Sequence, residues 1–363
     1  MDKNFINFHI LISHSPSCLN RDDMNMQKSA IYGGKRRVRV SSQSLKRAMR
    51  KSEYYLETLG APSLRTRNLG QFQEWIITQL ADRYEPELVR KALAWVSGKK
   101  DIATDTKGDA VAPWAIEEIA YVCQQIQAPE NNDLDEKKLQ KLIEKNNQGL
   151  RQALAQTVDI ALSGRMATSG LMSAVGKVDG ALAVAHAITT HSVDADIDWF
   201  TAVDDLQEMG SGHLDTQEFS AGVFYRYASL NIRQLQQNLG DASRQQALEI
   251  AAHVLHLLAT VVPSAKQQSF AAHNLADLAL VSFSDQPLSL ANAFEAPVRE
   301  TGKGYRLPSI EELHRYWQRL TLGYGLEDRC AEFAVESVNA PEKIAAKQSL
   351  LALEHWVRNN GEG

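Results

Sequence analysis

The stretch Phe5-Ile-Asn-Phe-His-Ile-Leu-Ile12 alternates in hydropathy, with every second residue apolar from Ile6 to Ile12. A period of two is typical of a β-strand, because successive side chains of a strand point to opposite faces. A loop rich in Ser, Pro and Asn follows, and a second alternating piece, Arg37 to Ser41, leads directly into a basic helix. The chain therefore places a strand, a loop, a strand and a helix in its first fifty residues.

Strand and helix signals in the rest of the chain complete the order β, α, β, β, α, β. Strand character resumes from Val178 to Thr190 and from Phe219 to Leu230, a helix follows from Ser243 to Thr260, and a strand from Leu278 to Phe283. This is the ferredoxin-like arrangement that RNA-recognition (RRM) folds share, so the pattern predicts an α+β fold. The order alone identifies no function, since this fold carries many unrelated activities.

A block with a different period interrupts this order. Between about Ser63 and Gly164 the apolar residues recur at helical spacing, and prolines separate the periodic segments. The block is predicted to be an all-helical insertion that follows the first helix.

The net charge of −5 is distributed unevenly over the 363 residues. From Arg21 to Lys51 there are ten Lys and Arg against two Asp, a local net of +8, so the remaining chain has a net of −13. A basic island in an acidic protein is typical of a localised site for a polyanion, because the positive potential is confined to where phosphates bind. A solvated charged face is the alternative interpretation.

The start of the basic helix favours the phosphate interpretation. Ser41, Ser42 and Ser44, together with Gln43, stand where the backbone N–H groups of a helix are free and hydroxyls are available to an anion. Leu45 to Lys51 contains four cations and no acid, whereas a merely solvated helix usually mixes both signs.

Two further segments suit contact with a nucleic acid. The run Ser163 to Gly170 combines glycines and hydroxyls, and its Met166 is suited to wedging against a base. The segment Asp194 to Glu218 lies between two predicted strands and holds eight acids, no Lys or Arg, and the adjacent Trp199 and Phe200. Aromatic residues on a hairpin arm suit stacking on bases, or packing on the arm's own core, and the acids suit docking on a basic neighbour such as another copy of the island.

No established catalytic or metal-binding motif is present. The three cysteines are far apart and form no Cys-x-x-Cys pair, which indicates neither a zinc site nor a disulfide framework and fits a reducing cytoplasm. No apolar run is long enough to span a membrane. His14, in the loop expected after the first strand, and Asp194, Asp196 and Asp198 keep open a His-dependent or metal-dependent endoribonuclease. We predict no cofactor and no metal.

Four long runs of the sequence resemble the repeated backbone (CasC-type) subunit of the type I-E CRISPR Cascade surveillance complex. These runs are Ser13–Lys28, Gly33–Arg50, Val158–Gly170 and His186–Asp205. The resemblance implies an RRM-like palm, an inserted all-helical fingers domain and a long β-hairpin thumb. The implied segments are palm at 1–56, 181–192 and 224–363, fingers at 57–180 and thumb at 193–223.

The resemblance also implies a function. Copies of such a subunit assemble head to tail along one guide RNA (crRNA), and the guide pairs with a strand of invading DNA in short segments. The implied partners are crRNA, target DNA, further copies of the chain, and the large, small, repeat-handle-binding and crRNA-processing endonuclease subunits. Carried over by position, the RNA-binding residues are Arg21, Lys28, Lys35, Ser41, Gln43, Lys46, Arg47, Arg50, Met166, Thr168, Trp199 and Phe200.

The sequence therefore predicts a cytoplasmic, non-enzymatic scaffold of CRISPR antiviral defence that presents crRNA for base pairing. Two alternatives remain open. One is the RRM-like endoribonuclease described above, and the other is a self-assembling scaffold without nucleic acid, whose basic island serves only the acidic arm.

Overall fold

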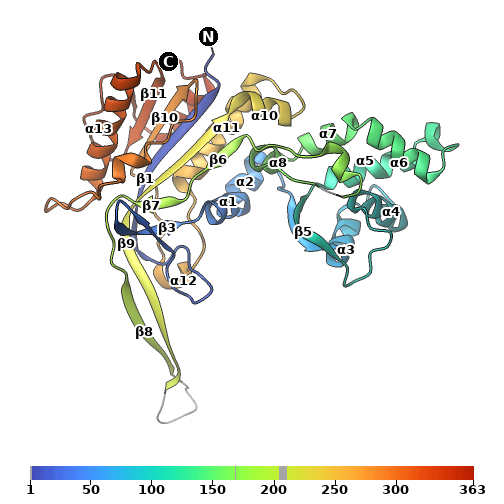
Figure 1. The fold of residues 1–363 in the computed structure, drawn as a ribbon, viewed down its shortest axis with the longest axis horizontal. Coiled ribbons are helices and arrows are strands. Elements are labelled where there is room, and N and C mark those ends of the chain that lie inside the picture. The colour runs from blue at the N-terminus through green and yellow to red at the C-terminus, as the bar shows by residue number, and fades with distance from the viewer. Residues whose placement is uncertain (1, 168, 204–210) are drawn as a thin grey trace. The chain divides into compact units, whose positions relative to one another are not determined.

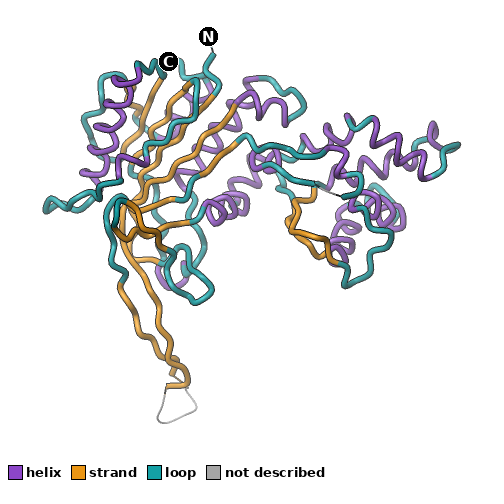
Figure 2. The backbone as a smooth tube through the Cα atoms, viewed as in Figure 1, coloured by secondary structure: helices purple, strands orange, loops and turns teal. Residues whose placement is uncertain are grey.

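The computed structural model describes residues 2–167, 169–203 and 211–363, and it confirms the mixed α+β class (Figures 1 and 2). The chain divides into two compact units. We call the first the sheet unit, which consists of Met1–Tyr55, Ala183–Leu230 and Leu248–Gly363. The second, the helical unit, consists of Leu56–Leu182 and Asn231–Ala247.

The sheet unit is built on one large sheet whose strands follow the order β12-β11-β10-β1-β9-β7-β3-β2, with β6 and β8 each paired to β9 outside that path. The predicted first strand is confirmed and continues beyond Ile12, and the predicted strand at 278 to 283 is confirmed as β10. The strands are β1 (Phe5–Ser17), β2 (Ser29–Tyr32), β3 (Lys35–Val40), β6 (Leu182–Val184), β7 (Ala187–Thr189), β8 (Asp196–Val203), β9 (Ser211–Asn231), β10 (Leu278–Ser284), β11 (Arg329–Ala334) and β12 (Ile344–Lys347).

Both faces of the sheet are covered, because alternate residues of β1 enter two different cores. Ile12 packs with Val40 of β3 and Leu45 of α1. Its neighbour Leu11 packs with Leu280 of β10 and Trp317 of α13. The helices of this unit are α1 (Ser42–Lys51), α11 (Arg244–Thr260, from Leu248 onward), α12 (Gln267–Phe270), α13 (Arg306–Tyr324) and α14 (Leu350–Arg358), and the residues of α2 (Glu53–Leu59) are divided between the two units.

The single strand expected from Val178 to Thr190 is wrong, since the segment forms the two short strands β6 and β7. At the break, Ala185 N donates to Tyr227 O at 2.9 Å, and the His186 ring accepts a hydrogen bond from Ser42 N at 2.9 Å. The alternating alanines give the pattern of a strand, but their small side chains add little packing to hold one. The histidine side chain instead joins the segment to the first turn of α1.

A long hairpin of β8 and β9 projects from the sheet as an arm (Figure 1). Its pairing register is fixed from Asp196 opposite Phe219 through Trp199 opposite Thr216. After Phe219, β9 continues into the sheet, where it pairs with β7 through Tyr225 and Ile188. One continuous strand therefore belongs both to the arm and to the sheet.

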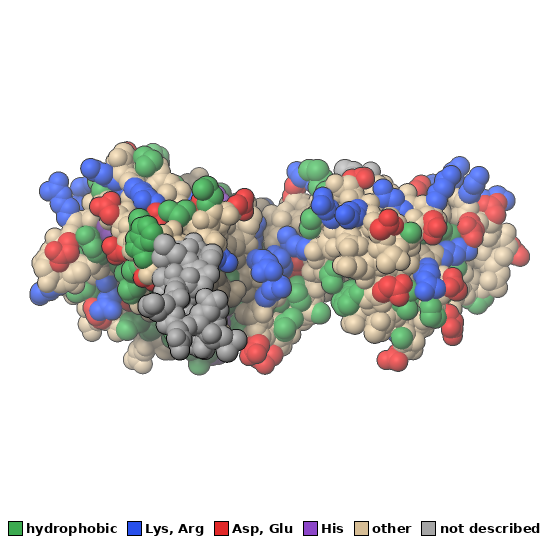
Figure 3. Space-filling model, turned by 90° about the horizontal axis from the view of Figure 1, so that it is seen from below, with side chains coloured by type: hydrophobic (Ala, Val, Ile, Leu, Met, Phe, Trp, Pro, Cys, Tyr) green, Lys and Arg blue, Asp and Glu red, His purple; other side chains and the backbone are tan. Residues whose placement is uncertain are grey.

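The helical unit contains the helices expected from its sequence period, but it is not all-helical. Phe72, Ile76, Trp95, Ile119 and Cys123, which define the period, lie in one buried cluster. In Figure 3 its basic and acidic side chains are interspersed over the visible face. The helices are α3 (Leu69–Gln79), α4 (Pro86–Ser97), α5 (Ile116–Gln127), α6 (Glu136–Lys145), α7 (Gln148–Ala155), α8 (Val158–Ser163), α9 (Met172–Val175) and α10 (Ile232–Asn238).

The correction concerns β4 (Leu64–Asn68) and β5 (Lys107–Trp114), which form a two-stranded sheet within this unit. Leu64 lies opposite Trp114, whose buried indole Nε1 donates to Thr66 O at 3.0 Å. The two strands are about forty residues apart, and nearly all of their residues are exposed or only half-buried, so neither shows an apolar alternation. Pairing between distant polar segments leaves no local signal in a sequence.

Candidate nucleic-acid interface

Helix α1 forms where the sequence provides both a cap and a buried stripe. The Ser41 side chain accepts a hydrogen bond from Ser44 N at 3.2 Å, which satisfies one of the free donors of the first turn. Leu45 and Met49 are buried, and the first turn contains no acid. Arg50 and Lys51 occupy the last turn, where cations interact favourably with the helix dipole. The core thus holds the helix and leaves its basic side at the surface.

A hollow of about 390 Å³ lies beside this helix, wholly within the sheet unit. Two of its lining residues, Arg21 and Arg47, are predicted to bind RNA. A third, Lys51, belongs to the basic island but not to the predicted RNA-binding set. Polar lining comes also from Asn20, Ser44, Ser52 and Ser264, and Val261, Val262, Pro263 and Ala265 form one wall. Three cations from two segments converge on one concavity, which is an electrostatic arrangement suited to phosphate.

The other predicted RNA-binding residues of the basic island do not line this hollow. Lys46 and Arg50 are half-buried on α1, Gln43 is exposed in its first turn, and Lys28 is half-buried before β2. None of the four lines the hollow. Lys35 is exposed at the start of β3. Arg21 and Arg47 therefore line one hollow, whereas the other predicted cations lie elsewhere on the segment from Arg21 to Lys51.

Not every cation of the island faces solvent. Arg37 is fully buried and donates to the carbonyl oxygens of Thr189, Phe294 and Glu295 at 3.0, 2.9 and 3.1 Å. Arg36 donates to the buried carboxylate of Glu218 at 3.4 Å, and the same carboxylate accepts from Gln27 N. One acid of the arm therefore contacts the island of its own chain.

The turn between β2 and β3 requires glycine. Gly33 and Gly34 both have positive φ, 57° and 71°, as a tight two-residue hairpin turn demands. A Cβ on Gly33 would lie 1.8 Å from Glu295 O, so a side chain at this position would push the turn away from the loop that binds Arg37. This close approach fixes the strand that carries the exposed Lys35.

The face of the sheet beneath α13 is closed by a buried polar network. The Tyr225 hydroxyl forms a hydrogen bond with His9 Nδ1 at 2.8 Å and accepts another from Leu290 N at 3.0 Å. Burial lowers the pKa of His9 to about 3, so its ring stays neutral. RRM domains bind RNA by stacking bases on aromatic side chains of an open sheet face. Here that part of the sheet is covered, and the basic surface around α1 is the available alternative.

His14 does not lie in a loop, as the sequence suggested. It is a buried residue of β1, which extends to Ser17, and its ring packs edge-on against Phe224 of the sheet. Its Nε2 lies 3.3 Å from Arg226 Nη2, and its Nδ1 lies 3.3 Å from Asn274 Oδ1. Burial, together with the charge of Arg226, lowers the pKa of His14 to about 3. These contacts are those of a packed structural residue.

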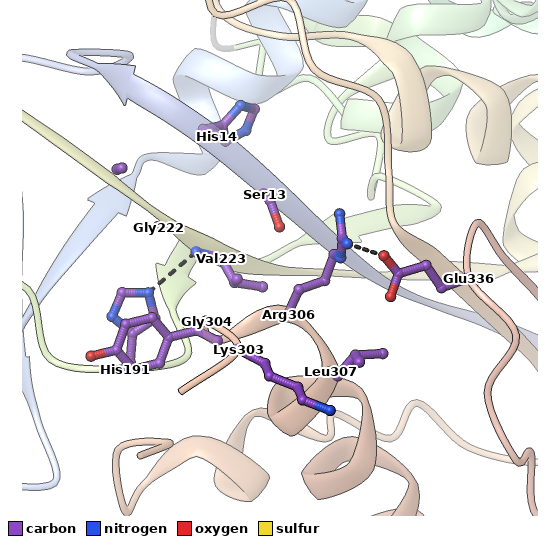
Figure 4. Close-up of a pocket in the computed structure, with 12 residues that line it drawn as sticks. Ser13, His14, His191, Gly222, Val223, Lys303, Gly304, Arg306, Leu307 and Glu336 are labelled. Atoms are coloured by element: carbon purple, nitrogen blue, oxygen red, sulfur yellow. Dashed lines mark hydrogen bonds and ion pairs between the residues drawn. The ribbon is translucent and has the colours of Figure 1, made fainter. Parts of the chain in front are cut away.

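A second hollow on this unit, of about 460 Å³, has His14 in its lining (Figure 4). His191 Nε2 accepts from Val223 N at 3.3 Å, and Arg306 forms an ion pair with Glu336. The cations Lys303 and Arg306 line the hollow together with the acid Glu336, and Arg306 Nη1 lies 3.5 Å from Asp277 Oδ1. The charges around this hollow therefore largely offset one another.

The arm exposes apolar surface. Trp199 is 68% exposed and Ile197, two residues earlier on the same face of β8, is 56% exposed. Asp194, Asp196 and Asp198 are exposed, and no group of three His, Cys, Asp or Glu side chains among the described residues could hold a metal ion. The side chain of Phe200 lies outside the described part of the chain.

The glycines of the loop from Ser163 to Gly170 have an internal role. A Cβ on Gly170 would lie 2.3 Å from Gly98 N, and a Cβ on Gly164 would lie 2.6 Å from Val178 O. Between them, Arg165 forms a fully buried bidentate ion pair with Glu118 of α5, with N–O distances of 2.5 and 2.7 Å. This packing holds Met166 at the surface, 71% exposed, and Thr168 lies outside the described residues.

Comparison with known proteins places this architecture in a family. The sequence matches the CT1975-like protein family over residues 6–358. The chain belongs to this family. No curated protein matches the sequence.

Two solved structures extend the likeness of this CT1975-like protein to the whole fold. A chain of a structure titled "CRISPR RNA-guided surveillance complex, pre-nicking" has a TM-score of 0.81 and 30% identity, and the match covers 99% of this chain and 100% of that one. A chain of a "CRISPR RNA-guided surveillance complex" has a TM-score of 0.59 and 26% identity, with 98% and 99% covered. These matches confirm the resemblance to a backbone-type subunit of a Cascade complex that the sequence predicted.

All twelve residues predicted to bind RNA fall within the range of the CT1975-like match. Their contacts with RNA remain predictions. Among the described residues, none of the helices combines the length and hydropathy needed to cross a membrane.

Proposed function

We propose that this CT1975-like protein is a non-enzymatic, crRNA-binding backbone subunit of a CRISPR surveillance complex in the cytoplasm. In this proposal its copies polymerise head to tail along the crRNA and present it for pairing with a strand of invading DNA. The observation that carries the proposal is the basic hollow formed by Arg21, Arg47 and Lys51 beside α1, in a chain whose full length resembles subunits of RNA-guided complexes.

The chemistry of the hollow favours the RNA backbone over its bases. Its cations approach from α1 and from the loop before β2, while the sheet face below α13 is closed by His9 and Tyr225. Lys and Arg contacts to phosphate bind every sequence alike and release counterions, so such binding is strong, non-specific and salt-dependent. Sequence reading is then left to base pairing between the guide and its target.

The predicted segments acquire roles within this proposal. The palm (1–56, 181–192 and 224–363) would carry the phosphate surface, the fingers (57–180) would present Met166 and Thr168, and the thumb (193–223) would present Trp199 and Phe200. Exposure of Met166 and Trp199 supports these two roles. The large, small, repeat-handle-binding and crRNA-processing endonuclease subunits are the further partners of this proposal.

A ribonuclease activity would require a base or a metal site, and the environment of His14 supports a structural role instead. We expect labelled RNA incubated with the purified chain to stay intact with or without Mg²⁺ or Mn²⁺. Cleavage that depends on the metal and is lost in Asp196→Asn would replace the scaffold with the endoribonuclease alternative.

Size-exclusion chromatography of the full chain tests the central claim, with absorbance followed at protein and nucleic-acid wavelengths before and after ribonuclease treatment. We expect a large RNA-rich peak that collapses to the monomer on digestion. A chain that stays monomeric and free of RNA, alone and with the other subunits present, contradicts the proposal.

A pair of variants with equal charge change shows whether the hollow is responsible. Arg47→Ala with Lys51→Ala removes two cations from the lining, and Arg319→Ala with Lys343→Ala removes two exposed cations elsewhere on the sheet unit. We expect only the first pair to weaken RNA binding strongly. Equal losses would mean that net charge, and not this hollow, recruits RNA.

A further inference from the structure

The wall of the basic hollow opposite α1 is attached to the sheet by a buried cation. Val261 to Ala265 line the hollow directly after the end of α11. Behind them lies Arg226 of β9, which is only 2% exposed. Its Nη1 donates to Leu258 O at 2.9 Å and to Val261 O at 2.8 Å. The guanidinium therefore binds one carbonyl group in the last turn of α11 and the carbonyl group of the first residue of the wall.

We propose that Arg226 is a positioning residue for RNA binding, because it fixes the Val261–Ala265 wall of the hollow without touching the RNA. The inference rests on the proposed function, since it concerns the same hollow. Arg226 lies on β9 in the middle of the sheet, whereas none of the predicted RNA-binding residues lies on that strand.

The contacts of Arg226 give the wall a rigid attachment. Carbonyl groups at the end of a helix lack intrahelical donors, and a cation there satisfies them and interacts favourably with the helix dipole. The second Nη donates to His14 Nε2, so the His14 proton sits on Nδ1 and is directed at Asn274 Oδ1. The guanidinium of β9 thus contacts α11 and β1 directly, and the segment at Asn274 joins it through His14.

The charge of Arg226 remains in place at neutral pH. Burial lowers the pKa of Arg226 only to about 10, which leaves the side chain protonated. Its partners here are two carbonyl oxygens and a neutral ring nitrogen, so these contacts stabilise the cation without cancelling its charge. A buried positive charge under the wall adds to the potential that Arg21, Arg47 and Lys51 create in the hollow.

Two substitutions separate the attachment from the charge. Arg226→Lys keeps the cation but cannot bind two carbonyl groups in a fixed fork, and Arg226→Met removes the charge at similar volume. We expect hydrogen exchange at the amides of Val262, Ser264 and Ala265 to become faster in both variants. The affinity of the full chain for a labelled single-stranded RNA should fall by about fivefold in Arg226→Lys, equivalent to about 1 kcal/mol, and further in Arg226→Met.

The salt dependence of binding identifies the type of role. Arg226→Lys keeps the cation, and a positioning residue touches no phosphate, so the slope of log K against log salt for this variant should equal that of the wild type. The matched control Arg47→Ala should reduce that slope by about one phosphate. A protein that is merely less well folded would instead show a smaller fraction of binding-competent chains at unchanged affinity.

Several outcomes overturn the inference. Wild-type affinity and exchange in Arg226→Lys contradict it, and if Arg226→Met does not fold, Arg226→Lys carries the test alone. A slope reduced as in Arg47→Ala would make Arg226 a phosphate contact. If Arg47→Ala also binds RNA normally, the proposed function of the hollow fails first, which distinguishes the two failures.

Discussion

Helix α1 and the β8–β9 arm are two of the regions proposed to contact RNA, and they are built in opposite ways. Helix α1 is basic, capped by Ser41 and anchored in the core through Leu45. The arm is acidic, contains two strands, and exposes Trp199 and Ile197. Contacts with the core of the sheet unit therefore hold α1 in place, whereas an isolated two-stranded hairpin is only marginally stable in water.

This difference separates two kinds of binding element. Cations on a helix that the core already holds are arranged before RNA arrives, so little ordering entropy opposes binding. Exposed aromatic residues on a projecting hairpin gain most of their contacts only when a partner covers them. We therefore expect substitutions of the buried residues of α1 to change the stability of the monomer, and substitutions on the arm to change assembly.

Leu45→Ala should have the largest effect of the changes considered. Leu45 is 2% exposed and packs with Val38, Val40 and Phe224, so its truncation leaves a cavity in the sheet core. We expect the free energy of unfolding in urea to fall by about 2–5 kcal/mol. Trp199→Ala is the matched control and should unfold like the wild type. A wild-type stability for Leu45→Ala would show that α1 is not held by this core.

Replacement of Trp199 and Phe200 by Ala tests the opposite half of the comparison. Each stacked base contact is worth about 1–3 kcal/mol, so we expect assembly on RNA to weaken by this order of magnitude. The melting temperature of the monomer should stay at the wild-type value, because Trp199 is exposed. A collapse of the melting temperature would show instead that this pair packs on the arm's own core.

Replacement of Lys46 and Arg50 by Ala tests the charge of α1 and leaves its buried residues unchanged. The slope of log K for RNA against log salt should fall by about two phosphates, equally for RNAs of different sequence. Because both residues lie outside the hollow lining, an unchanged slope would confine phosphate binding to the hollow itself.

The sequence predicted strands β1, β3, β9 and β10 and helix α1 because those patterns are local, but it did not predict β2, β11 or β12. The alternation of Phe5 to Ile12 and the run of cations from Lys46 to Lys51 are each visible within a few residues. The β4–β5 pair was missed because neither strand buries one face, and the strand from Val178 was wrongly extended because alanines alternate without packing strongly.

The residues of the candidate site were likewise predictable only where their pattern is local in the sequence. Lys51 could have been chosen from the sequence, since it is the last cation of the α1 run. Val261–Ala265 and Arg226 could not, because only the folded chain brings the segment after α11 into the lining of the hollow and places Arg226 against it. Arg37 illustrates the reverse case, in which a member of a basic run is buried and serves the carbonyl groups of its own chain.

Ser41 gives the smallest expected effect and the sharpest test of α1. Its oxygen accepts from Ser44 N, so Ser41→Ala removes a helix cap and should lower the free energy of unfolding by about 1 kcal/mol. The same hydroxyl retains a proton that can be donated to a phosphate. Ser41→Asp keeps the cap but replaces that donor with a negative charge. We therefore expect Ser41→Asp to restore thermal stability and to bind RNA more weakly than Ser41→Ala. If Ser41→Asp is stable and binds RNA like the wild type, Ser41 serves only as the cap, and the phosphate lies further along α1 toward Arg47.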